Sequence, residues 1–154
     1  MNFNVITTVA GTGQVCPYFR YCEEGIPATA ARVVSPYAVA VAPDGALYII
    51  QNQERLRRVS PDGIITTIAG SDSNSDGEGV PATSVRLFGA TRVVVGADGS
   101  LYLLERGNGR VRRIAPDGII TTFAGIPTGG STSDDILAVH AQLNGPVDIR
   151  LYRI

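Results

Sequence analysis

A β-branched run that ends in Ala-Gly occurs three times, and this repetition constrains the fold more than any other feature of the sequence. The run IITTIAG at residues 64–70 recurs as IITTFAG at 119–125, and an earlier copy, VITTVAG, occupies residues 5–11. Self-similarity at a fixed spacing is the signature of a repeat architecture, in which neighbouring units must stack to bury a common core. The chain is therefore predicted to be a repeat protein.

Three more runs recur with the same spacing. Residues 35–41 match 89–95, residues 47–50 match 101–104, and residues 55–59 match 110–114. The runs have the length of strands and are too short for helices. Asp-Gly turns follow the first and third runs of both repeats, and Asp-Gly between apolar runs is a strong hairpin signal. Each repeat is predicted to be a four-stranded antiparallel meander.

Meanders of this length with an apolar first strand are typical of β-propeller blades. The predicted fold is all-β, with complete blades at residues 35–70 and 89–125. Residues 5–11 are an orphan outer strand, meaning an outermost strand without its own blade, and residues 145–154 are an orphan inner strand. Because propellers need at least about four blades, two blades are not expected to close a ring.

Several motifs resemble NHL repeats. They are the VITTVAG run, the segment 25–33 that leads into Ser35-Pro36, and the hairpin Pro43-Asp44-Gly45 followed by Ala46-Leu47-Tyr48. The subtype is similar to that of teneurin-like proteins and bacterial YD-repeat surface proteins. This resemblance covers about residues 5–149 and implies a propeller fold at the cell surface. The usual Ala-Asp after the second strand is replaced by Ile50-Gln51 and Leu104-Glu105, which suggests a degenerate or truncated array.

Composition excludes several classes of function. The 154 residues carry a net charge of -1 and are 44% hydrophobic, so no overall basic field attracts nucleic acid. No apolar run is long enough for a membrane helix, and the first residues show no secretory signal. We expect no membrane insertion. An extracellular or cell-surface location is expected from the resemblance and from the two cysteines.

Cys16 and Cys22 lie in one loop. The resemblance implies that they form a disulfide; two free thiols are the alternative, and a metal site is disfavoured because the chain has one histidine. A disulfide would imply an oxidising compartment.

The arginines of each third strand suggest two readings. A basic nucleic-acid surface is possible in principle, but no aromatic side chains interleave with the arginines to stack on bases. We expect these arginines to pair with carboxylates such as Asp62 or Glu105, on a strand nearer the outside of the blade. The face that carries the long loops is the better binding surface, and its candidate binding residues are Gln53, Arg55, Asn108 and Arg110.

No catalytic or metal-binding set can be assembled from the sequence, and no cofactor is expected. His140 has no equivalent in the other repeats, and the acidic loop residues Asp72, Asp76 and Glu78 match no calcium-loop spacing. The predicted function is therefore a non-catalytic scaffold that binds protein or glycan. Its first expected partner is another copy of itself, in a closed oligomer or a fibre. The alternatives are a lyase or hydrolase that is active only after assembly, and an inert fragment of a larger YD-repeat protein.

Overall fold

The structure, a computed structural model, describes residues 5–15, 23–127 and 134–152 and contains two antiparallel sheets of five strands. The first sheet has the order β1-β5-β4-β3-β2 and the second has the order β6-β10-β9-β8-β7. In the first sheet the strands are β1 (Ile26–Pro27), β2 (Pro36–Val41), β3 (Leu47–Gln51), β4 (Arg55–Val59) and β5 (Ile64–Ala69). In the second they are β6 (Val80–Pro81), β7 (Ala90–Val95), β8 (Leu101–Glu105), β9 (Arg110–Ile114) and β10 (Ile119–Ala124).

The four predicted strands of each blade are present, and each blade gains a fifth. The added strands β1 and β6 are two residues long and pair with β5 and β10, the Ala-Gly runs of the repeat. Each is followed by a single 3-10 turn, η1 (Ala28–Ala30) or η2 (Ala82–Ser84). A two-residue strand has no periodicity, so no pattern in the sequence could reveal it. Two further 3-10 turns are η3 (Arg106–Asn108) and η4 (Ala138–His140).

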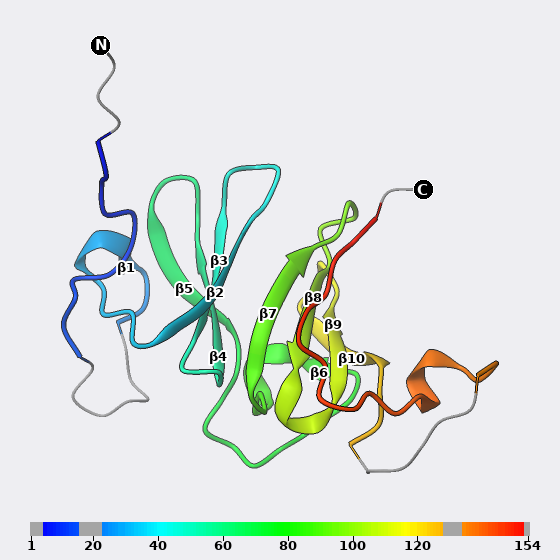
Figure 1. Ribbon diagram of the computed structural model, residues 1–154. Coiled ribbons are helices and arrows are strands. Elements are labelled where there is room, and N and C mark those ends of the chain that lie inside the picture. The colour runs from blue at the N-terminus through cyan, green and yellow to red at the C-terminus, as the bar shows by residue number, and fades with distance from the viewer. Residues whose placement is uncertain (1–4, 16–22, 128–133, 153–154) are drawn as a thin grey trace.

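The two sheets pack face to face, with β2 and β7 lying next to each other (Figure 1). Their shared core contains Ile50 and Leu56 from the first sheet, and Val93, Leu103 and Ile120 from the second, all buried. Each sheet has apolar side chains on both faces, because a propeller blade packs against a neighbouring blade on each side. With two sheets, only the two faces that meet are covered by another sheet.

The two orphan segments lie in repeat-equivalent places but form no strands among the described residues. The Gly11 amide donates to the carbonyl of Ala28 at 2.9 Å, and Gly70 makes the same bond to Ala82 at 3.0 Å. Residues 5–11 therefore enter the first blade as β5 enters the second. Residues 146–152 likewise follow Gly145, whose positive φ of 59° matches the 63° of Gly89 before β7. Neither segment has ladder partners within the described chain, and so neither is assigned as a strand.

No helix in the described ranges has the length and apolar character that crossing a bilayer requires.

Candidate interaction site

The outer face of the first sheet is apolar, and its part along β2 is exposed. Val39 of β2 and Val93 of β7 occupy the same repeat position, paired with Ile49 and Leu103 respectively. Val39 is 63% exposed, whereas Val93, which faces the first sheet, is 5% exposed. Val41 is 65% exposed on the same side as Val39. The difference between the two valines is the presence of a neighbouring sheet, so β2 presents a blade-packing surface that no second sheet among the described residues covers.

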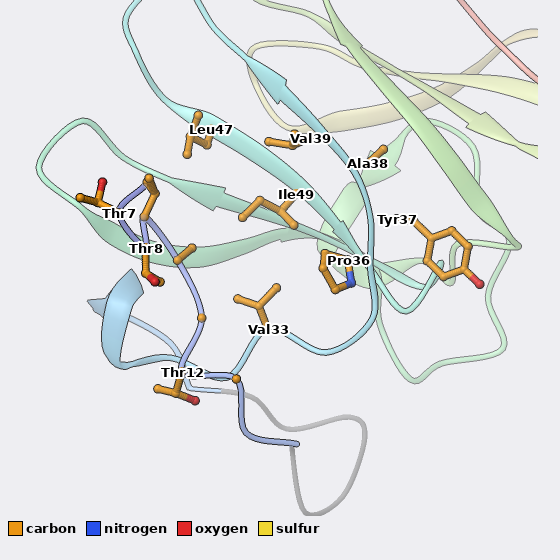
Figure 2. A pocket seen from close by; sticks show the side chains of 14 residues that line it. Thr7, Thr8, Thr12, Val33, Pro36, Tyr37, Ala38, Val39, Leu47 and Ile49 are labelled. Atoms are coloured by element: carbon orange, nitrogen blue, oxygen red, sulfur yellow. The ribbon is translucent and has the colours of Figure 1, made fainter. Parts of the chain in front are cut away.

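A groove of about 790 Å³ lies along this face. Residues 7–13 form one wall, and the side chains of Val39, Leu47 and Ile49 form the floor (Figure 2). Thr7 and Thr8 lie across the groove from the strands, and Val33 closes one end beneath Ile49. The lining is mainly aliphatic. It has the composition of a sheet-to-sheet core rather than that of a site for polar chemistry.

The far face of the second sheet is the complementary surface. The rings of Tyr102 and Phe123 meet edge to face on it, with centroids 5.0 Å apart at 79°, and Phe123 is 50% exposed. Arg92 forms an ion pair of 3.4 Å with Asp148, which holds the C-terminal segment against this face. Leu151 belongs to the same segment and lines a groove of about 440 Å³ beside Tyr102. This face is only partly covered.

Because the two sheets are repeats of each other, the open face of each sheet is equivalent to the packed face of the other. The face of the first sheet that packs on the second presents Ala38, Ala40, Tyr48 and Ile68 to the shared core. In the second sheet the equivalent positions, all on the open face, carry Arg92, Val94, Tyr102 and Phe123. The face around Val39 corresponds in turn to the buried face around Val93. The contact between the two sheets is thus a template for a contact between the two open faces.

The third strands β4 and β9 lie on the outer side of β3 and β8, as predicted, yet their side chains Arg57 and Arg112 are fully buried. Each binds the loop that leads into its own blade. Arg112 donates from Nη2 to the carbonyl of Gly77 at 2.6 Å, and Arg57 donates in the same way to Glu23 at 2.6 Å. These are structural contacts that tie an inter-blade loop to the centre of a sheet.

The residue after each of these carbonyls is a glutamate that also binds the buried arginine, Glu24 in the first blade and Glu78 in the second. The Glu78 carboxylate lies 3.4 Å from Arg112 and accepts hydrogen bonds from the amide and hydroxyl of Thr122, and Glu24 does the same with Arg57 and Thr67. The loop carboxylates considered as calcium ligands therefore bind arginine and threonine. Among the described residues no cluster of three or more His, Cys, Asp or Glu side chains could hold a metal ion.

Of the four predicted binding residues, Arg110 lies deepest, with 3% of its surface exposed. Its Nε donates to Glu105 at 2.5 Å, and its Nη2 contacts Asp76. The pairing with Glu105 is the one expected from the sequence. Burial raises the pKa of the Glu105 carboxyl, although the charge of Arg110 and the amide of Phe88 act in the opposite direction.

The other three candidates lie on the predicted loop face. Arg55 donates to Asp72 at 2.8 Å and to the carbonyl of Gly70 at 3.3 Å. Gln53 has a positive φ of 58°, and its carbonyl accepts the amide of Ala90 at 2.9 Å, which links the two blades. Asn108 ends η3 and lines a small polar cavity. Ser60 and, more weakly, the charge of Arg58 lower the pKa of Asp62, the other predicted acidic partner. The Asp44 carboxylate also lies 3.5 Å from Arg58.

Cys16 and Cys22 lie outside the described residues, so their predicted disulfide stays a prediction. His140 is exposed at the end of η4. Val39, Val41, Tyr102 and Phe123 were not predicted as interaction residues. The repeat contained this information, because these residues occupy positions that a neighbouring blade would have to cover.

Comparison with known proteins identifies the family. The family model of the teneurin NHL domain matches residues 1–85, more than half of the chain. The chain belongs to the teneurin NHL domain family. This agrees with the NHL resemblance seen in the repeat motifs.

Teneurin sequences extend the match over most of the chain. Mouse Teneurin-1 is 33% identical over 135 residues, which is 82% of this chain. Chicken Teneurin-1 is 31% identical over 131 residues, and zebrafish Teneurin-3 is 36% identical over 93 residues. The matched region spans 3–5% of the length of these relatives.

Solved structures support the fold of this teneurin NHL chain. A structural-genomics protein of unknown function from Bacteroides thetaiotaomicron superposes with a TM-score of 0.58 and 24% identity, over 72% of this chain and 28% of that one. An auxiliary nutrient binding protein from Bacteroides ovatus superposes with a TM-score of 0.54 and 25% identity, over 70% and 30%. Both likenesses concern the arrangement of repeated sheets.

Proposed function

We propose that this chain is a non-catalytic repeat scaffold that assembles through its open blade faces and presents its loop face to a protein or glycan. A teneurin-type NHL repeat is the established part of this description. The observation that carries the proposal is the exposure of Val39 at a position that is buried when a neighbouring sheet is present. The expected location is extracellular or at the cell surface, as the resemblance implies.

The partner proposed for the open face of the first sheet is the open face of the second sheet in another copy. Val39, Val41 and Leu47 would meet Val94, Tyr102 and Phe123, as Val93, Val95 and Leu101 meet the first sheet within the chain. Such a contact joins two different surfaces and is therefore heterologous. It gives a ring if the rotation between copies closes, and a fibre if it does not.

A specific observation also favours a second role for the same faces. The matched region is 3–5% of each teneurin relative, so additional blades of a longer polypeptide could cover both open faces. The chain would then be one segment of a larger propeller. Both readings predict the same packing chemistry and differ in whether the covering sheet belongs to the same polypeptide.

A structural role for the charged groups supports the non-catalytic part of the proposal. Glu105, the buried carboxylate with a raised pKa, is held by Arg110 and by the amide of Phe88. Asp76 and Glu78 hold Arg110 and Arg112. A general acid or base must reach a substrate proton directly or through one water, whereas these carboxylates face arginines of their own blade.

Light scattering at micromolar concentration, coupled to size-exclusion chromatography, tests assembly of the chain as given. We expect a mass above that of one chain for the unmodified protein, and a monomer for Val39→Asp, which places a charge in the open face. Thr83→Asp is the matched control. Thr83 lies in η2, which contacts β5 of the first sheet, and it is exposed, so the same charge there should leave the mass unchanged.

A stable monomer of the unmodified chain would refute self-assembly and leave the faces to blades of a longer polypeptide. An oligomer that Val39→Asp does not weaken would refute the proposed contact. Repeating the measurement with reductant tests whether Cys16 and Cys22 contribute.

A further inference from the structure

Each blade ends at a junction, where its last strand leads into the next blade or segment. The two junctions differ in the side chains that fill them. At the first junction, between the two sheets, Arg86 Nη2 lies 3.2 Å from Glu54 Oε1, and Arg55 Nη2 lies 2.8 Å from Asp72 Oδ1. These ion pairs occupy the junction and leave a space of about 30 Å³. Charged side chains therefore seal the first junction.

At the second junction the same repeat positions carry smaller or uncharged residues. Glu54, Asp72 and Arg86 correspond to Gly109, Pro127 and Gln142. The remaining cavity has a volume of about 200 Å³. It lies where the segment after η4 crosses the end of the second sheet that carries η3 (Figure 1). Because these residues cannot form the ion pairs of the first junction, a pocket remains on the loop face, which is the predicted binding face.

Two polar groups at this cavity lack partners. Every other arginine in the described ranges has a carboxylate within ion-pair distance, but Arg106, an exposed residue that lines the cavity, has none. The Oε1 atom of Gln142 is buried and has no hydrogen-bond partner among the described residues. A buried acceptor without a partner costs free energy, and rotation of the amide towards the cavity would let a bound hydroxyl group satisfy it.

The lining defines the chemistry of that ligand. Asn108, Gln142 and Asn144 offer amide groups that both donate and accept, and none of the described residues that line the cavity is a carboxylate. A guanidinium without an internal partner is suited to a carboxylate, and paired amides are suited to hydroxyl groups. The volume lies below the roughly 300–1,000 Å³ of pockets for drug-sized ligands, so it accommodates a single ring.

We propose that this cavity binds one acidic sugar unit, with its carboxylate on Arg106 and its hydroxyl groups on the amides of Asn108, Gln142 and Asn144. This site deepens the glycan-binding part of the proposed function by naming the class of sugar. It requires only the second sheet and the segment that follows η4, and it does not depend on assembly.

Titration of the ¹⁵N-labelled chain with methyl β-D-glucuronide and methyl β-D-glucoside, followed by two-dimensional NMR, tests the site. We expect saturable shifts of the Gly107, Gly109 and Asn144 amides with the glucuronide, and at least about tenfold weaker binding of the glucoside. Arg106→Gln should weaken glucuronide binding about tenfold and remove the preference between the two sugars. Arg150→Gln, a change of the same kind at a mostly exposed arginine, should leave both affinities unchanged.

Gln142→Arg introduces the residue of the first junction and should abolish binding by filling the cavity. Absence of saturable binding, equal affinity for the two sugars, shifts away from the cavity, or an unaltered Arg106→Gln affinity would each overturn the proposal. The titration is repeated in the Val39→Asp background, where the glucuronide affinity should be the same. Failure of assembly is read by light scattering and failure of sugar binding by NMR, so the two are distinguishable.

Discussion

Val39 and Val93 hold the same place in consecutive inner strands, yet one is 63% exposed and the other 5%. Their backbone pairings are equivalent, Val39 with Ile49 and Val93 with Leu103. The chain thus contains both the covered and the uncovered state of one surface. This internal comparison allows the energetics of blade packing to be measured within a single molecule.

A charge should destabilise the chain strongly at Val93 and only slightly at Val39. Val93→Asp buries a carboxylate between the sheets and is expected to destabilise the chain by about 3 kcal/mol or more. Val39→Asp changes an exposed position and should alter the stability of the single chain by about 0.5 kcal/mol or less. Urea unfolding at a concentration low enough to keep both variants monomeric measures the difference. Equal destabilisation would show that the open face is not an equivalent of the buried one.

The buried Arg112 should be more important for stability than its position on a third strand suggests. Its guanidinium satisfies the Gly77 carbonyl and the carboxylates of Asp76 and Glu78. Arg112→Met removes the buried partner of each of these groups and is expected to cost about 3–5 kcal/mol. Hydrogen exchange of residues 76–80 should accelerate in parallel, because the loop loses its attachment. Arg150→Met, at a side chain that is 74% exposed, is the control, and a similar small cost for both would contradict the prediction.

Asp98 should be ionised at unusually low pH. The hydroxyl and amide of Ser100, together with Arg113, lower its pKa from 3.8 to about 2. Because the pKa is depressed in the folded chain, its contribution to stability is present above about pH 4 and is lost as the pH falls towards 2. Ser100→Ala should raise the pKa of Asp98 towards 3.8, and Ala46 at the equivalent position of the first blade shows that the fold accepts the methyl group. Carboxyl ¹³C NMR measures both values, and an unchanged pKa would exclude the hydroxyl as the main cause.

Much of the fold could be predicted from the sequence because its signals are local and repeated. Asp-Gly turns and alternating runs predict the four main strands of each sheet, and the spacing of the repeats predicts the blades. The two-residue strands β1 and β6 could not be predicted, since their pairing depends on how the inter-blade loop returns to β5 and β10. The burial of Arg57 and Arg112 was missed for a related reason: their partners at Glu23 and Gly77 come from the preceding loop, more than 30 residues away.

The candidate site was only partly predictable. The sequence indicated that incomplete blades leave apolar faces uncovered, and it selected the loop face that carries Asn108. The cavity beside Asn108 was not predicted, because it exists where Gly109 and Gln142 replace the charged side chains of Glu54 and Arg86. Such a loss becomes visible only when the two junctions are superposed in space.

The glycine that ends each Ala-Gly run should differ in its tolerance of a side chain, although the three sequence copies look alike. Gly70 has a φ of 96°, and a Cβ there would overlap the carbonyl oxygen of Glu54. Gly11 has almost the same φ, 94°, but its nearest neighbour to a Cβ is the Cβ of Val33 at 3.6 Å, an ordinary contact. The close approach at Gly70 comes from the β3–β4 loop of its own blade, and the described chain holds no such loop beside Gly11.

Alanine substitution separates backbone strain from this close approach. Gly63→Ala, at a positive φ with open space around it, should cost about 1–2 kcal/mol from strain alone, and Gly11→Ala should cost no more. Gly70→Ala should cost a further 1–3 kcal/mol or so, because the outer strand must move away from Glu54. Urea unfolding of the three variants gives the comparison. If Gly11→Ala were as costly as Gly70→Ala, residues 5–11 would have to pack against a β3–β4 loop supplied by another chain, which would itself place that segment within a composite blade.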